Sequence, residues 1–143
     1  MKEISKFYKS LVQEVVTRQI ANEEGDNQEQ AFTRICLELL SEAGETENTD
    51  VAFYERDLGT PNQQKVNGYA IADNYETVDL FLSIYEGTEE SVTILKRDIE
   101  NASKRLINFF RNAIYSDFGN EIEESSSIFE FVNTLGNYKE LRD

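Results

Sequence analysis

The chain has 143 residues, with 14 lysines and arginines against 28 aspartates and glutamates, so its formal net charge is −14. It has no histidine and one cysteine, which excludes an imidazole general base, a histidine-containing catalytic triad, a zinc site of the usual kind and an internal disulfide. The length fits one domain over residues 1–143, and 39% hydrophobic residues are enough for a core. No apolar run reaches the roughly 18 residues of a membrane span, and the charged N-terminus shows no export signal, so we expect a cytoplasmic protein without membrane contact.

The first part of the chain predicts two amphipathic helices, over about residues 3–21 and 27–43. In both segments, apolar residues recur every three or four positions between charged ones. Asp26 with Glu29 matches a capping box at the start of the second helix. Gly44 follows this helix where a residue in the left-handed conformation commonly ends one.

The middle of the chain changes to a two-residue period and predicts three strands, over about residues 51–56, 65–72 and 77–85. The segments are rich in β-branched and aromatic residues. Four polar residues separate the second strand from the third, which favours a hairpin.

Helical spacing returns over about residues 89–116 and 127–136. The longer of these helices would brace the sheet, and Ser127 with Glu130 predicts a cap for the shorter one, which Gly136 would end. The element order ααβββαα predicts an α+β fold, with a three-stranded mixed or antiparallel sheet flanked by helices.

Three short motifs carry a family resemblance: Phe32-x5-Glu38-Leu-Leu-x-Glu42-Ala-Gly44, Lys65-Val-Asn-Gly-Tyr-Ala-Ile-Ala-Asp73 and Leu80-Phe-Leu-Ser-Ile-Tyr85. Over most of residues 5–115, the chain resembles the N-terminal domain of bacterial abortive infection phage resistance (AIPR) proteins. The resemblance implies a restriction-endonuclease-like fold, summarised as PD-(D/E)xK. Because such proteins are longer, it also implies the N-terminal module of a longer chain, whose partner is its own C-terminal region or another subunit.

The resemblance further implies where a nuclease site would lie. In this fold an acid on the second strand and an acid-x-lysine on the third hold Mg²⁺, often with a glutamate from the preceding helix, and the lysine steadies the attacking water. Asn67, a neutral amide, stands at the position of the strand-two acid. On the third strand Asp79 is not followed by x-Lys, and Ser83-Ile-Tyr85 has neither acid nor lysine.

Glu38, Asn67 and Asp79 are therefore the remnant catalytic candidates, with Glu38 and Asp79 as metal ligands if a site exists. Simpler roles are an exposed helix flank, a strand amide beside a glycine and a strand-face acid. We expect a degenerate module that needs no cofactor and has a structural, oligomerisation or regulatory role. The alternative is a Mg²⁺-dependent endonuclease with an incomplete or migrated site, in which Lys65 or Lys104 supplies the lysine.

The charge is unevenly distributed. Residues 21–60 hold two arginines against eleven acids, whereas residues 95–111 hold five basic residues against two acids. Arg97, Lys104 and Arg111 alternate with Asn101 and Asn108 along one stripe of the long predicted helix, which is a candidate nucleic-acid surface or simply a solvated face. The acidic segment argues against nucleic-acid binding by this domain alone and leaves a further alternative, an acidic protein-binding module or DNA mimic.

Overall fold

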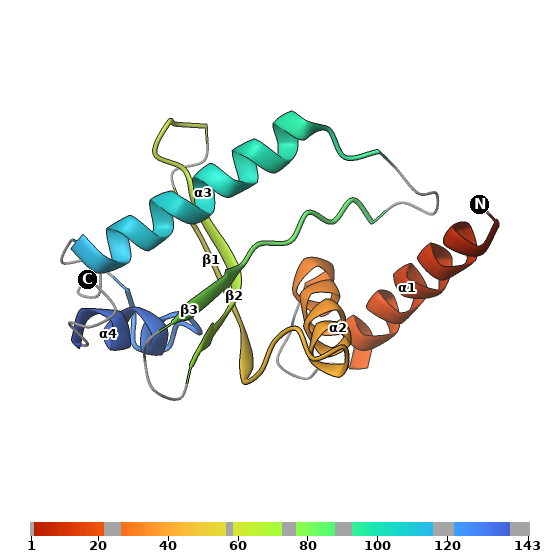
Figure 1. Ribbon diagram of the computed structural model, residues 1–143, viewed down its shortest axis with the longest axis horizontal. Coiled ribbons are helices and arrows are strands. Elements are labelled where there is room, and N and C mark those ends of the chain that lie inside the picture. Colours follow the sequence, from red (N-terminus) through yellow and green to blue (C-terminus); the bar gives the residue numbers. More distant parts are fainter. Residues whose placement is uncertain are drawn as a thin grey trace.

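The computed structural model describes residues 2–21, 27–56, 59–72, 77–87, 93–115 and 122–137. Its elements are α1 (Lys2–Ala21), α2 (Gln28–Glu42), β1 (Thr49–Arg56), β2 (Gln64–Ile71), β3 (Val78–Phe81), α3 (Lys96–Tyr115) and α4 (Phe129–Asn137). The predicted α+β class and element order are confirmed. Figure 1 shows α3 and α4 on one side of the sheet and α2 on the other, with α1 beyond α2. Within the described ranges, no helix combines the length and the apolar composition that a bilayer crossing requires.

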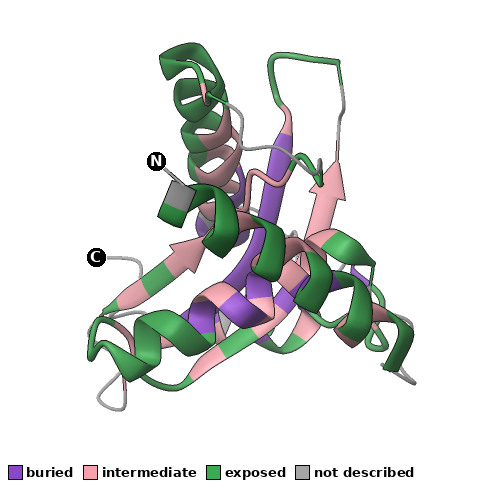
Figure 2. Ribbon diagram, turned by 90° about the vertical axis from the view of Figure 1, so that its right-hand side faces the viewer, coloured by how far each residue is buried: buried purple, intermediate pink, exposed green. Residues whose placement is uncertain are grey.

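The sheet is antiparallel, with β2 in the centre. β2 is buried along almost its whole length, as Figure 2 shows. The pairing of β1 with β2 shifts between Val51 and Tyr54. Val66 and Tyr69 both pack into the core on the α3 and α4 side although they are three residues apart, so the two-residue alternation of β2 is interrupted between them. Asn67, in this interruption, directs its side chain to α2.

The main core lies between the sheet and the two C-terminal helices. The ring of Phe131 in α4 lies 4.5 Å from the ring of Tyr69 and 6.0 Å from that of Phe109 in α3, measured between centroids. The predicted brace is confirmed, because α3 packs along β2. The buried members of this core are Ala52, Val66, Tyr69, Phe109, Ala113, Ile114, Ile122, Ile128, Phe131, Val132 and Leu135.

A second, smaller core joins α1 to α2. It consists of Val15, Ala31 and Ile35, with Leu11, Phe32 and Tyr85 packed against it. The sequence predicts a wide apolar face for the first helix, but Phe7 is 60% exposed and Ile20 80% exposed. The reason is that α1 packs mainly against one helix, and a single helix pair buries only a narrow stripe.

The N-terminus of α2 is capped one residue later than predicted. The side chain of Asn27 accepts from the backbone N–H of Gln30 at 2.8 Å, and the Gln30 side chain accepts from the N–H of Asn27 at 3.2 Å. This is a capping box, as predicted, but with a different pair. The predicted Asp26 lies outside the described residues. Glu29 is not part of the box, and its carboxylate is directed to β2 instead.

The C-terminus of α2 has the predicted glycine stop. Gly44 has a φ of +78°, the left-handed region that glycine adopts without strain. The N–H of Glu45 donates to the carbonyl of Leu40 at 2.9 Å, and that of Gly44 donates to the carbonyl of Ser41 at 3.0 Å. These two bonds form a Schellman motif, which satisfies carbonyls that the helix itself leaves free.

The last helix begins at Phe129 rather than at 127, and it extends through the predicted stop, Gly136. The hydroxyl of Ser127 accepts from the backbone N–H of Phe53 in β1 at 3.3 Å. Ser127 therefore connects the approach to α4 with the sheet, while Glu130 lies in the first turn of α4.

The third strand is shorter than predicted. Hydrogen-bonded pairing with β2 covers Val78–Phe81 only, instead of residues 77–85. Beyond Phe81 the backbone N–H of Ser83 donates to the side-chain oxygen of Asn67 at 2.9 Å. Pairing stops because this side chain takes the place of a backbone partner.

The long helix also starts later than predicted, at Lys96 instead of 89. The backbone N–H of Leu95 donates to the carboxylate of Asp98 at 3.4 Å, and the N–H of Asp98 donates back to the carbonyl of Leu95 at 2.9 Å. This local pair fixes the first turn. Residues 89–92 and 116 of the predicted helix lie outside the described part of the chain.

Candidate functional site

Polar residues from α2, β2 and the segment after β3 meet in a buried cluster. Asn67 is 0% exposed and Lys65 is 9% exposed, although lysine is almost never buried unless it is paired. Glu29 and Thr33 lie about one turn apart on α2, so their side chains are on the same face of the helix. We call this group the α2–sheet cluster; it consists of Glu29, Thr33, Lys65, Asn67 and Ser83.

The carboxylate of Glu29 is bound at both of its oxygens. Lys65 Nζ lies 2.6 Å from Oε1, and Asn67 Nδ2 donates to Oε2 at 3.1 Å. Glu55 of β1 approaches the same ammonium group from the sheet, with its Oε2 at 4.0 Å from Lys65 Nζ. Burial is tolerated here because the lysine is charge-paired and the carboxylate has two internal donors.

The orientation of the Asn67 amide is fixed by its two partners. Its NH₂ group donates to Glu29, and its Oδ1 accepts from the N–H of Ser83. Thr33 Oγ1 donates to the carbonyl of Glu29 at 2.8 Å and lies 2.6 Å from Ser83 Oγ. Since a hydroxyl has one proton, Ser83 donates in this second bond. The cluster therefore connects α2, β2 and the segment after β3. In each of these hydrogen bonds a donor faces an acceptor.

Gly68 lets the backbone of β2 come close to its neighbours beside this cluster. A Cβ at this position would lie 2.9 Å from the carbonyl oxygen of Asp50 and 3.3 Å from Cδ1 of Leu37. The first contact is with backbone, which cannot move aside cheaply. The Asn-Gly pair of the second motif thus joins a polar bridge to a glycine that the packing requires.

Glu38 and Asp79 lie elsewhere. Glu38 is nine residues after Glu29 on α2, which is a rotation of roughly 180° around the helix, and its Oε1 lies 2.8 Å from Nη1 of Arg18 on α1. The hydrogen bond from Arg18 lowers the pKa of Glu38. Asp79 is exposed and is paired with Ala70 in the sheet. The structure thus brings Lys65 to Asn67 and does not bring Glu38 or Asp79 there.

The α2–sheet cluster does not fit a magnesium ion. Mg²⁺ is bound by oxygen ligands, usually with one or more carboxylates. Here Asn67 contributes a neutral amide in place of a carboxylate, and the ammonium group of Lys65 already binds the central carboxylate, that of Glu29. Among the residues that the structure describes, no group of three acids or cysteines is placed to hold a metal ion.

Glu29 was not singled out as a site residue by the sequence. Its spacing from Asp26 fits a capping box, and because this already explains the presence of Glu29, the sequence gives no separate sign of its role in the cluster. The available signal was Lys65, a charged residue at the start of a strand whose other residues carry no charge. A buried lysine needs a carboxylate partner, but the sequence does not say which of 28 acids supplies it.

The predicted basic stripe lies on α3, on the other side of the sheet from α2 (Figure 1). Arg97, Lys104 and Arg111 are all exposed, as a solvated face or a binding surface requires. Two asparagines separate them along the helix. One of these, Asn108, bonds to the connection between β1 and β2.

The family model described as the abortive infection phage resistance protein N-terminal domain matches residues 32–142. The chain belongs to this family. The AIPR N-terminal domain has a role in abortive infection, a defence against phage. The match includes Lys65, Asn67 and Ser83 of the α2–sheet cluster, while Glu29 precedes it. No curated protein and no solved structure matches the chain, so the restriction-endonuclease-like fold of this AIPR domain stays a prediction.

Proposed function

We propose that this AIPR N-terminal domain is a catalytically degenerate nuclease-like module that serves phage defence in a structural or regulatory role. Its partner would be the C-terminal region of the same protein or another subunit. The observation that carries the proposal is the state of Asn67: it stands at the expected position of the strand acid, is fully buried, and has both ends of its amide bound within the protein.

The charge of the cluster supports this proposal. A divalent cation at this position would lack the negative charge of a strand acid and would have to displace the ammonium group of Lys65, which lies 2.6 Å from Glu29 Oε1. Of the two β2 side chains in the cluster, only Asn67 has an oxygen, and this oxygen, Oδ1, already accepts from the N–H of Ser83. These hydrogen bonds hold α2 on the sheet. A stable sheet with helices on both sides provides a surface to which other protein segments can bind.

A cleavage assay tests the proposal. We expect the purified chain to leave single-stranded and duplex DNA and RNA intact in Mg²⁺ or Mn²⁺, and we expect neither metal to raise its melting temperature. Cleavage that is lost in Glu29→Gln would refute degeneracy. Glu38→Gln is the matched control, because it neutralises another α2 glutamate outside the cluster.

One observation favours a second candidate, the endonuclease with a migrated lysine. Lys65 and the strand amide of Asn67 bind the two oxygens of one helix glutamate, Glu29, which is the type of neighbourhood that a migrated catalytic lysine would need. The same assay decides between the two. Metal-dependent cleavage that disappears in both Lys65→Met and Glu29→Gln, while both variants keep their fold by circular dichroism, would establish the enzyme.

A further inference from the structure

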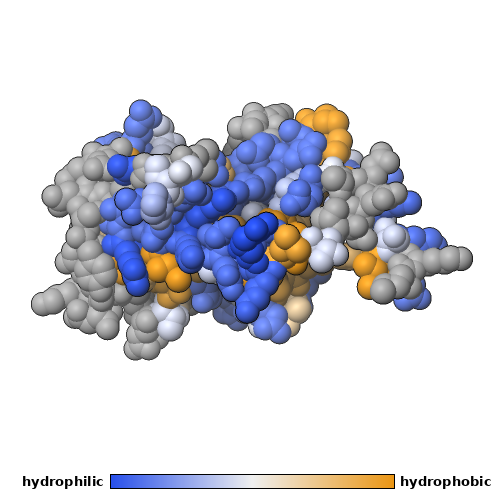
Figure 3. Space-filling view, turned by 90° about the horizontal axis from the view of Figure 1, so that it is seen from above, coloured by the Kyte–Doolittle hydropathy of each residue, from blue (hydrophilic) through white to orange (hydrophobic). Residues whose placement is uncertain are grey.

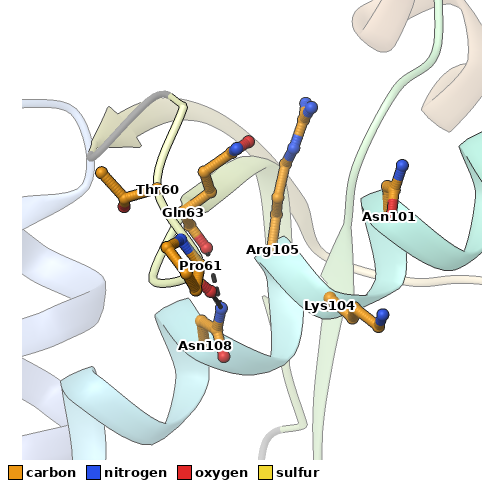
Figure 4. Close-up of a pocket in the computed structure, with 7 residues that line it drawn as sticks. All are labelled: Thr60, Pro61, Gln63, Asn101, Lys104, Arg105 and Asn108. Atoms are coloured by element: carbon orange, nitrogen blue, oxygen red, sulfur yellow. Dashed lines mark hydrogen bonds between the residues drawn. The ribbon is translucent and has the colours of Figure 1, made fainter.

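A cavity of about 330 Å³ lies between α3 and the connection from β1 to β2 (Figure 4). It is outside the α2–sheet cluster and on the other side of the sheet. The connection contributes Thr60, Pro61 and Gln63. The helix contributes Asn101, Lys104, Arg105 and Asn108, so the cavity opens on the basic stripe.

Hydrogen bonds hold the two walls of this cavity together. Asn108 Nδ2 donates to the carbonyl of Gln63 at 3.0 Å and to that of Pro61 at 3.4 Å, and Figure 4 shows its amide directed at these carbonyls. The N–H of Gln63 donates to the carbonyl of Thr60 at 3.3 Å, which closes a turn. The described part of the connection, residues 59–63, is therefore held against α3 without a ligand, which lowers the cost of ordering this wall on binding.

The lining is rich in donors and carries positive charge. Lys104 and Arg105 supply two cations, and no residue that the structure places in the lining is an acid. Neither cation forms an ion pair with a residue in the described part of the chain. This is unexpected in a chain with twice as many acids as bases. The guanidinium group of Arg105, the ammonium group of Lys104 and the amide of Asn101 are groups of the kind that bind phosphate oxygens, and in Figure 4 the two charged groups project from α3 in different directions.

We infer that this cavity is a phosphate-binding site, to which the exposed stripe of α3 adds further contacts along a nucleic-acid backbone. Arg97 and Arg111 flank the cavity on the same stripe and lie roughly 20 Å apart along the helix axis, a span that covers several phosphates of one strand. Seen from above, the described surface over α3 is mostly hydrophilic (Figure 3). The acids of α2 lie beyond the sheet (Figure 1), and salt screens exposed charges over about 8 Å at physiological ionic strength.

Binding of a fluorescein-labelled oligonucleotide to the full chain, followed by anisotropy over a salt series that includes physiological ionic strength, tests the inference. Lys104→Ala and Arg105→Ala are each expected to weaken binding roughly tenfold, as loss of one charge-assisted hydrogen bond predicts, and to lower the salt slope by about 1. Lys96→Ala is the matched control: Lys96 is a lysine of the same helix, lies outside the cavity lining and pairs with Glu100. No binding by the wild-type chain, or equal losses in Lys104→Ala and Lys96→Ala, overturns the proposal.

Two sources of phosphate are separated by a second measurement. Inorganic phosphate and AMP are titrated into isotopically labelled protein, and amide shifts are followed at Asn101, Lys104 and Arg105. Amide shifts, together with weaker oligonucleotide binding by Arg97→Ala and Arg111→Ala, indicate a nucleic-acid backbone. Amide shifts without weaker oligonucleotide binding by these variants indicate a free nucleotide or phosphate. Because neither readout involves cleavage, failure here leaves the proposal of a degenerate nuclease site unaffected, and the converse also holds.

Discussion

Asn67 is the residue on which the α2–sheet cluster depends, and aspartate is the informative substitution. Asn67→Asp replaces the NH₂ donor by an oxygen and sets two carboxylates side by side, because Glu29 Oε2 lies 3.1 Å from the replaced nitrogen. We expect this buried change to lower the free energy of unfolding by about 1–3 kcal/mol. Urea unfolding measures it. Asp79→Asn makes the reverse change at an exposed position, and its free energy of unfolding should stay within about 0.5 kcal/mol of the wild-type value. An unchanged free energy of unfolding in Asn67→Asp would show that the amide is not needed.

Tyr69 gives the core a dependence on alkaline pH. Burial, with the nearby carboxylates of Asp50 and Glu130, raises the pKa of Tyr69 to about 12, whereas a tyrosine in the unfolded chain titrates near 10. A raised pKa means that its contribution to stability is complete below about pH 10 and is lost as the pH rises towards 12. Thermal unfolding across this range should show a smaller decline in Tyr69→Phe than in the wild type. Parallel declines would contradict it.

The sequence identifies some site residues and misses others for a physical reason. Asn67 stands out because a motif assigns its position. Glu29 does not, because the pattern of a capping box fits both Asp26 with Glu29 and Asn27 with Gln30, and only the packed structure shows that the second pair is used. Glu38 and Glu29 are equally plausible on α2 until the rotation of the helix against the sheet is known.

At the scale of the elements, the hydrophobic periodicity of the sequence is sufficient to predict the type and order of the helices and strands but not where each one begins and ends. Periods of 3.6 and 2 depend on side chains within one element, so the predicted helices and strands are present. The end of β3 depends on Ser83 bonding to a side chain sixteen residues away, and the exposure of α1 depends on how few neighbours cover it. Both are properties of long-range packing, which periodicity does not contain.

The two faces of α1 should therefore contribute very differently to stability. Val15 is fully buried in the smaller core, and Phe7 is largely exposed. We expect Val15→Ala to cost about 1–3 kcal/mol and Phe7→Ala less than about 0.5 kcal/mol. Urea unfolding followed by circular dichroism gives both values. A similar loss for Phe7→Ala would indicate that its side chain is covered in the folded protein.

At the scale of the whole molecule, the sheet separates the acidic α2 from the basic stripe of α3. The segment 28–50, which forms α2, the loop after it and the start of β1, is rich in acids and has one basic residue, Arg34. α3 carries the basic stripe on the other side of the sheet (Figure 1). The basic stripe is confined to α3, because α4 on the same side of the sheet carries Glu130 and no basic residue in its described part. A partner would therefore meet a local basic stripe on this side and the acidic α2 on the other.

This excess of acids predicts that moderate salt stabilises the fold. Like charges repel most strongly in the compact state, and salt screens exposed charges more than the largely buried pair of Lys65 and Glu29. We expect the melting temperature to rise from low to physiological ionic strength, equally in sodium chloride and potassium chloride. Glu47→Gln removes one exposed charge from the acidic segment and should reduce the rise. A melting temperature that falls with salt would mean that attractive ion pairs, such as Arg18 with Glu38, outweigh the repulsion.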